Sequence, residues 1–222
     1  MTKNFSIAID GPAGAGKTTQ AKALAKALGF VYVDTGAMYR ALAVYMQGEE
    51  LEDVPEILPE VNLQAAWDEE GNQRMSINGV DVTDLLRTPE ISRLASDIST
   101  IPEVRDFLLG TQREIARENN VVMEGRDIGT VILPDATLKI FLTASLDERA
   151  WRRSRQLEPG TYLLSSVKKD IERRDRNDSS RDAAPLMQAE DAILVDCTRM
   201  DIKETTQTVL RLWGEALARK AD

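Results

Sequence analysis

The chain has 222 residues, of which 42% are hydrophobic and none is histidine, so it suits one domain with a full core and excludes mechanisms that need imidazole. Its net charge of −9 argues against binding to nucleic-acid backbones, and no stretch stays apolar for the ~18 residues of a membrane span, so we expect neither partner. With one cysteine, Cys197, it has no internal disulfide, and we expect a soluble, cytoplasmic protein.

Five short apolar runs occur along the chain, and most are separated by segments of helical periodicity. Such alternation predicts an α/β fold with a parallel sheet and crossover helices. We predict strands at Phe5–Ile9, Val31–Val33, Val121–Met123, Leu138–Leu142 and Ile193–Val195. We predict helices from the first glycine-rich turn to Gly29 and over residues 37–47, 91–119 (broken near Pro102), 147–155, 165–174 and 202–219.

The segment GPAGAGKT, Gly11–Thr18, follows the first predicted strand and leads into the first predicted helix. It matches G-x-x-x-x-G-K-[ST], in which small residues let backbone N–H groups turn toward a phosphate at a helix N-terminus. Lys17 is expected to reach the β- and γ-phosphates of a nucleoside triphosphate, and the Thr18 hydroxyl to hold Mg²⁺. The alternative is a glycine-rich turn that only permits close packing. The candidate nucleotide-binding residues are Gly11, Pro12, Ala13, Gly14, Ala15, Gly16, Lys17, Thr18 and Thr19.

The segment VYVDTGAMYR, Val31–Arg40, follows the same plan at the second predicted strand. It places Asp34, Thr35 and Arg40 around a strand-to-helix turn. Asp34 and Thr35 suit either a ligand site or helix N-capping, and both interpretations stay open. Arg40, one turn inside the helix, is expected to face the same crevice as the glycine-rich segment and to hold a second phosphate with two N–H groups.

Residues 62–87 interrupt the helical pattern. The stretch QRMSINGVDVTDLL alternates in polarity and contains Asn78-Gly79, a dipeptide typical of a two-residue hairpin turn. We therefore predict an inserted β-hairpin lobe at 62–87 within a single domain of residues 1–222. An acidic run with nine acids and no base, Glu49–Glu70, overlaps the start of this lobe.

The segment VVMEGRDIGTVILPDA, Val121–Ala136, begins as an apolar strand and ends in charged residues. The carboxylate of Glu124 resembles a Walker-B residue, which orients Mg²⁺ or its waters. Arg126 and Asp127 follow in a loop at the carboxyl end of the strand, the edge at which such sheets bind ligands. A buried ion pair with a structural role only is the alternative.

Arginine is concentrated near the C-terminal side of the chain, where residues 149–181 contain ten bases against five acids. In an otherwise acidic protein, this predicts a surface that faces a small, highly charged anion. The stretch RRDRNDSSRDAAPL, Arg173–Leu186, interleaves Arg174, Arg176 and Arg181 with acids and serines. We predict a mobile lid over residues 156–182, the alternative being a solvated charge run.

Together, DGPAGAGKTT, DTGAMYR, EGRDIGTVILPDA and RRDRNDSSRDAAPL, in this order over nearly the whole chain, resemble the bacterial cytidylate (CMP) kinases. The resemblance implies a P-loop NTPase fold with a five-stranded parallel sheet, a small β-rich insertion in the monophosphate-binding region and an Arg-rich lid. It also implies transfer of the γ-phosphoryl group of ATP, with Mg²⁺, to CMP or dCMP, giving ADP and CDP or dCDP. We further expect a monomer.

The resemblance also assigns residues by motif. It places Thr35, Arg40, Arg126 and Arg181 at the monophosphate, Arg174 and Asp178 at the sugar, and Ser96, Arg105 and Asp127 at the cytosine base. The catalytic residues on this assignment are Lys17, Arg126, Arg174 and Arg181. Two positions depart from the usual family pattern: Glu124 stands where an aspartate is usual, and Thr35 stands where some members have serine.

Direct in-line transfer fits this composition, because positioning and charge neutralisation supply the acceleration and no imidazole is needed. Three alternatives compete with this reaction. A kinase of the same fold could use another acceptor, such as adenylate, thymidylate or a small metabolite. A nucleotide-dependent switch or adaptor would hydrolyse its nucleotide slowly without an acceptor. A nucleic-acid-binding ATPase is disfavoured by the acidic balance and the lack of an aromatic stacking platform.

Overall fold

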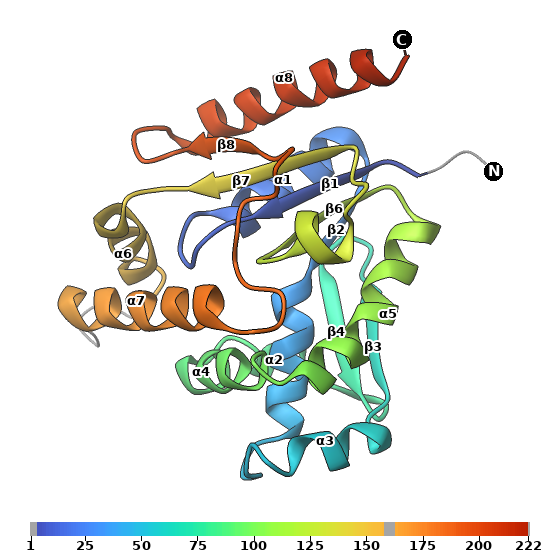
Figure 1. Ribbon diagram of the computed structural model, residues 1–222, viewed down its shortest axis with the longest axis vertical. Coiled ribbons are helices and arrows are strands. Elements are labelled where there is room, and N and C mark those ends of the chain that lie inside the picture. Colours follow the sequence, from blue (N-terminus) through green and yellow to red (C-terminus); the bar gives the residue numbers. More distant parts are fainter. Residues whose placement is uncertain (1–3, 158–162, 222) are drawn as a thin grey trace.

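The computed structural model describes residues 4–157 and 163–221. A five-stranded parallel sheet lies between helices, and a smaller three-stranded sheet lies below it in Figure 1. The strands of the large sheet are β1 (Ser6–Asp10), β2 (Val31–Asp34), β6 (Val121–Gly125), β7 (Leu138–Thr143) and β8 (Ile193–Asp196). They run in the order β2-β6-β1-β7-β8, and every pairing is parallel. The predicted α/β class and the five predicted strands are confirmed.

Except for a short helix at Val54–Ile57, which was not predicted, the helices lie close to their predicted positions. They are α1 (Lys17–Leu28), α2 (Thr35–Tyr45), α3 (Val54–Ile57), α4 (Pro89–Ile98), α5 (Pro102–Glu118), α6 (Leu146–Ser154), α7 (Leu164–Ser180) and α8 (Ile202–Ala221). The break near Pro102 is confirmed, because α4 ends at Ile98 and Pro102 begins α5. The predicted end of α7 at Arg174 is wrong, since the helix continues to Ser180. Among the described residues, no helix combines the length and the apolarity that a membrane crossing requires.

Apolar side chains of β1 point alternately to the two faces of the large sheet. Ile7 and Ile9 pack with Leu24 of α1 and with residues of α8. Ala8 points the other way, into a core that includes Met38 of α2. A central strand buried on both faces is the arrangement expected of a parallel sheet. It leaves the carboxyl ends of the strands as the edge at which polar side chains gather.

The smaller sheet contains the predicted hairpin and one further strand. Its strands are β3 (Leu63–Trp67), β4 (Gln73–Ile77) and β5 (Val80–Asp81), and neighbouring strands are antiparallel. Asn78 and Gly79 join β4 to β5 with φ angles of 50° and 80°, as a type I′ turn requires. Residues of β3 and β4 pack against the core around α2. The small sheet therefore lies beside the part of the fold that carries Thr35 and Arg40.

Candidate active site

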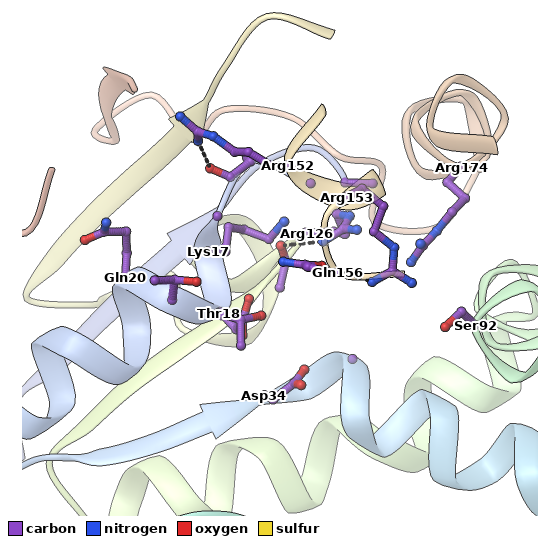
Figure 2. Close-up of a pocket in the computed structure, with 18 of the residues that line it drawn as sticks. Lys17, Thr18, Gln20, Asp34, Ser92, Arg126, Arg152, Arg153, Gln156 and Arg174 are labelled. Atoms are coloured by element: carbon purple, nitrogen blue, oxygen red, sulfur yellow. Dashed lines mark hydrogen bonds between the residues drawn. The ribbon is translucent and has the colours of Figure 1, made fainter. Parts of the chain in front are cut away.

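A cleft of about 1200 Å³ opens at the carboxyl ends of the parallel strands. Figure 2 shows its centre, where Arg153 and Arg174 point from α6 and α7 into the space between Thr18 and Ser92. Every predicted site residue lines this cleft except Gly11 and Pro12. The structure thus brings together four segments that lie far apart in the sequence.

The glycine-rich segment has a backbone that larger residues cannot adopt. Gly11 has a φ angle of 149°, and a Cβ added there would lie 2.0 Å from the carbonyl oxygen of Leu142. Gly16 precedes α1 with a φ angle of 97°, in the left-handed region that favours glycine. The two glycines are therefore required by backbone sterics, and they place Lys17 and Thr18 at the N-terminus of a helix.

Lys17 lies folded onto its own loop. Its side chain is 5% exposed, and its Nζ donates hydrogen bonds to the carbonyl oxygens of Gly11 and Pro12, each at 2.8 Å. Burial, and then the nearby charge of Arg126, lower the pKa of Lys17 to about 7. The lowered pKa means that the protonated form of Lys17 is disfavoured in the protein. An anionic ligand next to Nζ would stabilise that form and raise the pKa toward its usual value, so the site favours anions.

Glu124, near the end of β6, is hydrogen-bonded both to Thr18 at the end of the glycine-rich segment and to Tyr32 of the neighbouring strand β2. Its carboxylate is buried, accepts a hydrogen bond from the Tyr32 hydroxyl at 2.7 Å and is hydrogen-bonded to the side chain of Thr18. Burial, and then the charge of Asp34, raise the pKa of Glu124. The side chain thus reaches the residue predicted to hold Mg²⁺, although it is one methylene longer than the usual aspartate.

The oxygen atoms of Thr18 and Glu124 fit a Mg²⁺ ion that is coordinated mainly by the phosphates of a bound nucleotide. A hydroxyl and a carboxylate oxygen are the atom types that Mg²⁺ prefers. Within residues 4–157 and 163–221, no group of three His, Cys, Asp or Glu side chains is placed to hold a metal ion by itself. Mg²⁺ in kinase sites is bound through one or two protein oxygens together with substrate phosphates, which matches this arrangement.

The arginines predicted at the monophosphate are held by carboxylates of the protein itself. Arg40 pairs with Asp34 at 2.7 Å, and the Nε of Arg126 pairs with Asp178 at 2.6 Å. Asp34 also caps α2 by accepting the N–H of Ala37, so the capping interpretation of Asp34 is correct. These two pairs keep the guanidinium groups of Arg40 and Arg126 oriented.

The three residues predicted at the base lie together. Asp127 is buried between Arg105, with which it forms a hydrogen-bonded ion pair, and Arg181, whose NH2 is 3.5 Å from its carboxylate. The guanidinium of Arg105 also lies over the ring of Tyr39, 5.7 Å from its centroid. Ser96 is buried, and its hydroxyl has no hydrogen-bond partner within the described part of the chain. This group therefore offers buried donors and an acceptor for a polar ring.

Arg153 and Arg174 also contribute to the cationic lining of the cleft. Burial, and then the charge of Arg126, lower the pKa of Arg174 to about 10. Burial also lowers the pKa of Arg153, which the sequence analysis did not single out although it lies in the arginine-rich stretch. Arg176, predicted to lie in the lid, is exposed and lies outside the cleft lining. Of the predicted lid, residues 158–162 lie outside the described residues, and Leu164–Ser180 form α7.

Comparison with known proteins gives the family. Residues 7–215 match the family model described as cytidylate kinase. The chain belongs to the cytidylate kinase family. The match confirms the family that the four motifs predicted. It also confirms that the protein is a nucleotide-binding phosphotransferase.

Individual relatives agree over nearly their whole length. A cytidylate kinase from Caldicellulosiruptor saccharolyticus is 45% identical over 222 residues, covering 97% of this chain and 98% of the relative. Cytidylate kinases from Carboxydothermus hydrogenoformans and Desulfitobacterium hafniense are 47% and 48% identical, covering 94% and 97% of this chain and 96% and 95% of theirs. An uncharacterized protein from Eubacterium ventriosum, 14% identical with a TM-score of 0.56, shares the fold over 96% of this chain and 99% of its own.

The sequence analysis of this cytidylate kinase family member missed two residues of the small sheet that support the site. Trp67 Nε1 donates to the carbonyl oxygen of Tyr32 at 2.7 Å. The Gln73 side chain accepts from the N–H of Asp34 at 2.7 Å and donates to the carbonyl oxygen of the same residue at 3.2 Å. Trp67 and Gln73 face each other in the β3–β4 register. We call this pair the β2 clamp, because it satisfies the outer backbone groups of β2 immediately before Thr35.

Proposed function

We propose that the protein transfers the γ-phosphoryl group of MgATP to CMP or dCMP, giving ADP and CDP or dCDP. One observation carries the proposal: a single cleft is lined by the glycine-rich loop, by the buried Ser96, Arg105 and Asp127, and by several arginines. Such a lining suits a triphosphate donor, an acceptor phosphate and a polar base bound in the same cleft. Family membership supports the same reaction.

The residues Gly11–Thr19 are proposed to hold the triphosphate. Lys17 would leave the carbonyl oxygens of Gly11 and Pro12 and bind the β- and γ-phosphates. Thr18, with Glu124 hydrogen-bonded to it, would hold Mg²⁺. The ion, when bound, neutralises phosphate charge and makes the terminal phosphorus easier to attack.

The acceptor is proposed to replace protein carboxylates as the partner of the arginines. Thr35, Arg40, Arg126 and Arg181 would bind its phosphate, and Arg174 and Asp178 its sugar. Ser96 and Arg105 would donate to the ring acceptors of cytosine, and Asp127 would accept from its amino group. Because the ion pairs already orient these guanidiniums, little side-chain ordering remains to be done when the acceptor binds.

Transfer itself needs positioning and charge neutralisation more than acid–base chemistry. The phosphate oxygen of CMP is a competent nucleophile, so no general base is required. Residues 156–182 would act as a lid that excludes water, and residues 62–87 as an inserted lobe on the acceptor side. We also infer that a monomer is active, because one chain supplies every residue of the proposed site. A cytoplasmic location remains an expectation from the sequence.

Steady-state rates with ATP and a panel of acceptors test this function. We expect CMP and dCMP to be used best, with UMP, AMP and dTMP weaker and cytidine inactive because it lacks the phosphate. A preference for AMP or dTMP would indicate a kinase of the same fold with another acceptor. Slow hydrolysis of ATP or GTP that no acceptor accelerates would indicate a switch.

Binding of MgATP should depend on pH through Lys17. In the nucleotide-free protein the pKa of Lys17 is lowered to about 7, and triphosphate next to it raises this pKa. Nucleotide binding therefore takes up protons above pH 7, and the apparent affinity falls as the pH rises. Calorimetry at pH 8 in two buffers of different ionisation enthalpy should detect uptake approaching about one proton per ATP. Equal heats in the two buffers would contradict this.

Loss of the β2 clamp should affect the acceptor more than the donor. Replacing Gln73 by leucine removes both partners of the Asp34 backbone, at a cost of about 1 to 3 kcal/mol per unsatisfied group. Since Asp34 orients Arg40, we expect KM for CMP to rise about tenfold and KM for ATP to change less than about twofold. Arg74→Gln is the control, because Arg74 is exposed and pairs with Asp81. Equal increases in both KM values would show a general loss of structure instead.

A further inference from the structure

Ala13 belongs to the glycine-rich loop, but its contacts belong to α6 and α7. Its N–H donates to the Asp175 carboxylate at 2.9 Å, and its carbonyl oxygen accepts from NH1 of Arg149 at 2.9 Å. Its methyl group is 3% exposed and lies in a small apolar cluster with Ala150, Val167 and Ile171. Both polar groups and the side chain of this one loop residue are therefore bound by the two helices.

Arg149 and Asp175 also bind each other, at 2.5 Å. The Nε of Arg149 donates in addition to the carbonyl oxygen of Ala144, just after β7, at 3.0 Å. The backbone of α6 also lies close to the glycine-rich loop. A Cβ added at Gly14 would be only 3.1 Å from the Arg149 carbonyl oxygen. One arginine thus joins the end of a central strand, the glycine-rich loop and α7.

Neither residue belongs to the cleft itself. The described residues that line the cleft include Glu148, Trp151, Arg152 and Arg153 of α6 and Arg174 and Asp178 of α7, whereas Arg149 and Asp175 are absent from the lining. Asp175 directly follows Arg174 in α7. The contact at Ala13 therefore lies behind the cationic side chains and sets their distance from the glycine-rich loop.

We propose that Arg149 and Asp175 are positioning residues, which hold α6 and α7 on the glycine-rich loop at Ala13 so that the arginines of these helices meet the transferring phosphoryl group. We call this contact the Ala13 joint. An apolar cluster alone would allow the helices to slide, because burial has no directional preference, whereas two backbone hydrogen bonds and an ion pair fix the orientation. The inference rests on the proposed function, since it assigns the joint a part in phosphoryl transfer.

The test compares Asp175→Ala with the parent enzyme and with Asp170→Ala. Asp170 lies on the same helix, is about half exposed at 47%, and pairs with Arg173 at 3.6 Å. We expect Asp175→Ala to lower kcat by about 10- to 100-fold, because a misplacement of about 1 Å has effects of this size. KM for ATP and for CMP should each change less than about threefold, since the groups that bind substrate remain. Asp170→Ala should keep the parental kcat.

A graded variant separates positioning from simple instability. Asp175→Asn keeps an oxygen that accepts from the Ala13 N–H but loses the ion pair with Arg149, so its kcat should lie between those of the parent and Asp175→Ala. All rates are divided by the fraction of folded enzyme, taken from thermal unfolding of each variant. A parental kcat for Asp175→Ala, or a loss that this correction removes, would overturn the proposal.

The parent enzyme keeps the two proposals distinguishable. Its rates with the acceptor panel report on the proposed function alone. If another acceptor proves best, the ratio of variant to parent is measured with that acceptor, and the Ala13 joint is still confirmed or overturned.

Discussion

Replacing Lys17 by alanine is expected to lower kcat at least about 100-fold, while the dissociation constant of CMP changes less than about threefold. Lys17 is assigned to the β- and γ-phosphates, whose charge redistributes in the transition state, so its contribution is larger there than in the bound substrate. The residues proposed to bind CMP keep their ion pairs when Lys17 is replaced.

Rapid-quench measurement of a single turnover, together with equilibrium binding of CMP, would test this. Lys26→Ala is the matched control, because Lys26 lies on the same helix and is exposed. The variant should also lose the proton uptake on nucleotide binding, since the titrating group is gone. A kcat near that of the parent would remove Lys17 from the reaction and with it the assignment of the loop.

Replacing Asp127 by asparagine is expected to narrow the preference for CMP over UMP. Cytosine offers an amino group beside N3 and O2 acceptors, whereas uracil offers a carbonyl and an N3–H in place of the first two. A site with an arginine donor and a carboxylate acceptor distinguishes them, and mismatched buried groups cost about 1 to 3 kcal/mol each. The parent should therefore favour CMP in kcat/KM by about one to two orders of magnitude or more.

The ion pairs of Asp127 add a second expectation. The carboxylate lies between Arg105 and Arg181, so its neutralisation leaves two buried guanidiniums with less compensating charge. Because breaking a buried pair costs about 3 to 5 kcal/mol, a lower unfolding temperature is expected together with the narrower preference. Asp182→Asn is the control for loss of one negative charge, because Asp182 is exposed and directly follows Arg181. An equal fall for CMP and UMP would mean that Asp127 holds the arginines and does not contact the base.

The parallel sheet and the glycine-rich loop were predictable because their signals are local in the sequence. Apolar runs specify buried strands, and the segment matching G-x-x-x-x-G-K-[ST] directly follows the first of them. The last turns of α7 were missed because Asn177, Asp178 and Ser179 are weak helix formers. Tertiary contacts override that weakness, since Asp178 pairs with Arg126 from a loop 52 residues earlier.

Side-chain partners between distant segments were the part of the candidate site that a single sequence does not reveal. The family resemblance assigned both Arg105 and Asp127 to the cytosine base. Their spacing in the sequence did not predict that the two side chains form an ion pair with each other. The third strand of the small sheet, Leu63–Trp67, was missed because LQAAW is short and partly composed of weak strand formers. The role of Ala13 was not predictable from the sequence, because the residues that contact it lie on helices more than a hundred residues later in the chain.

The β2 clamp has a consequence for how the chain folds. β2 is one of the two edge strands of the large sheet, and an uncovered strand edge is a template for pairing with another molecule. Gln73, which covers that edge, follows Asp34 by 39 residues and precedes β6, so the small sheet has been synthesised before β2 can pair with its neighbour in the large sheet. A shortened chain without β3 and β4 would keep its edge open permanently, and self-association of that variant is the result to expect.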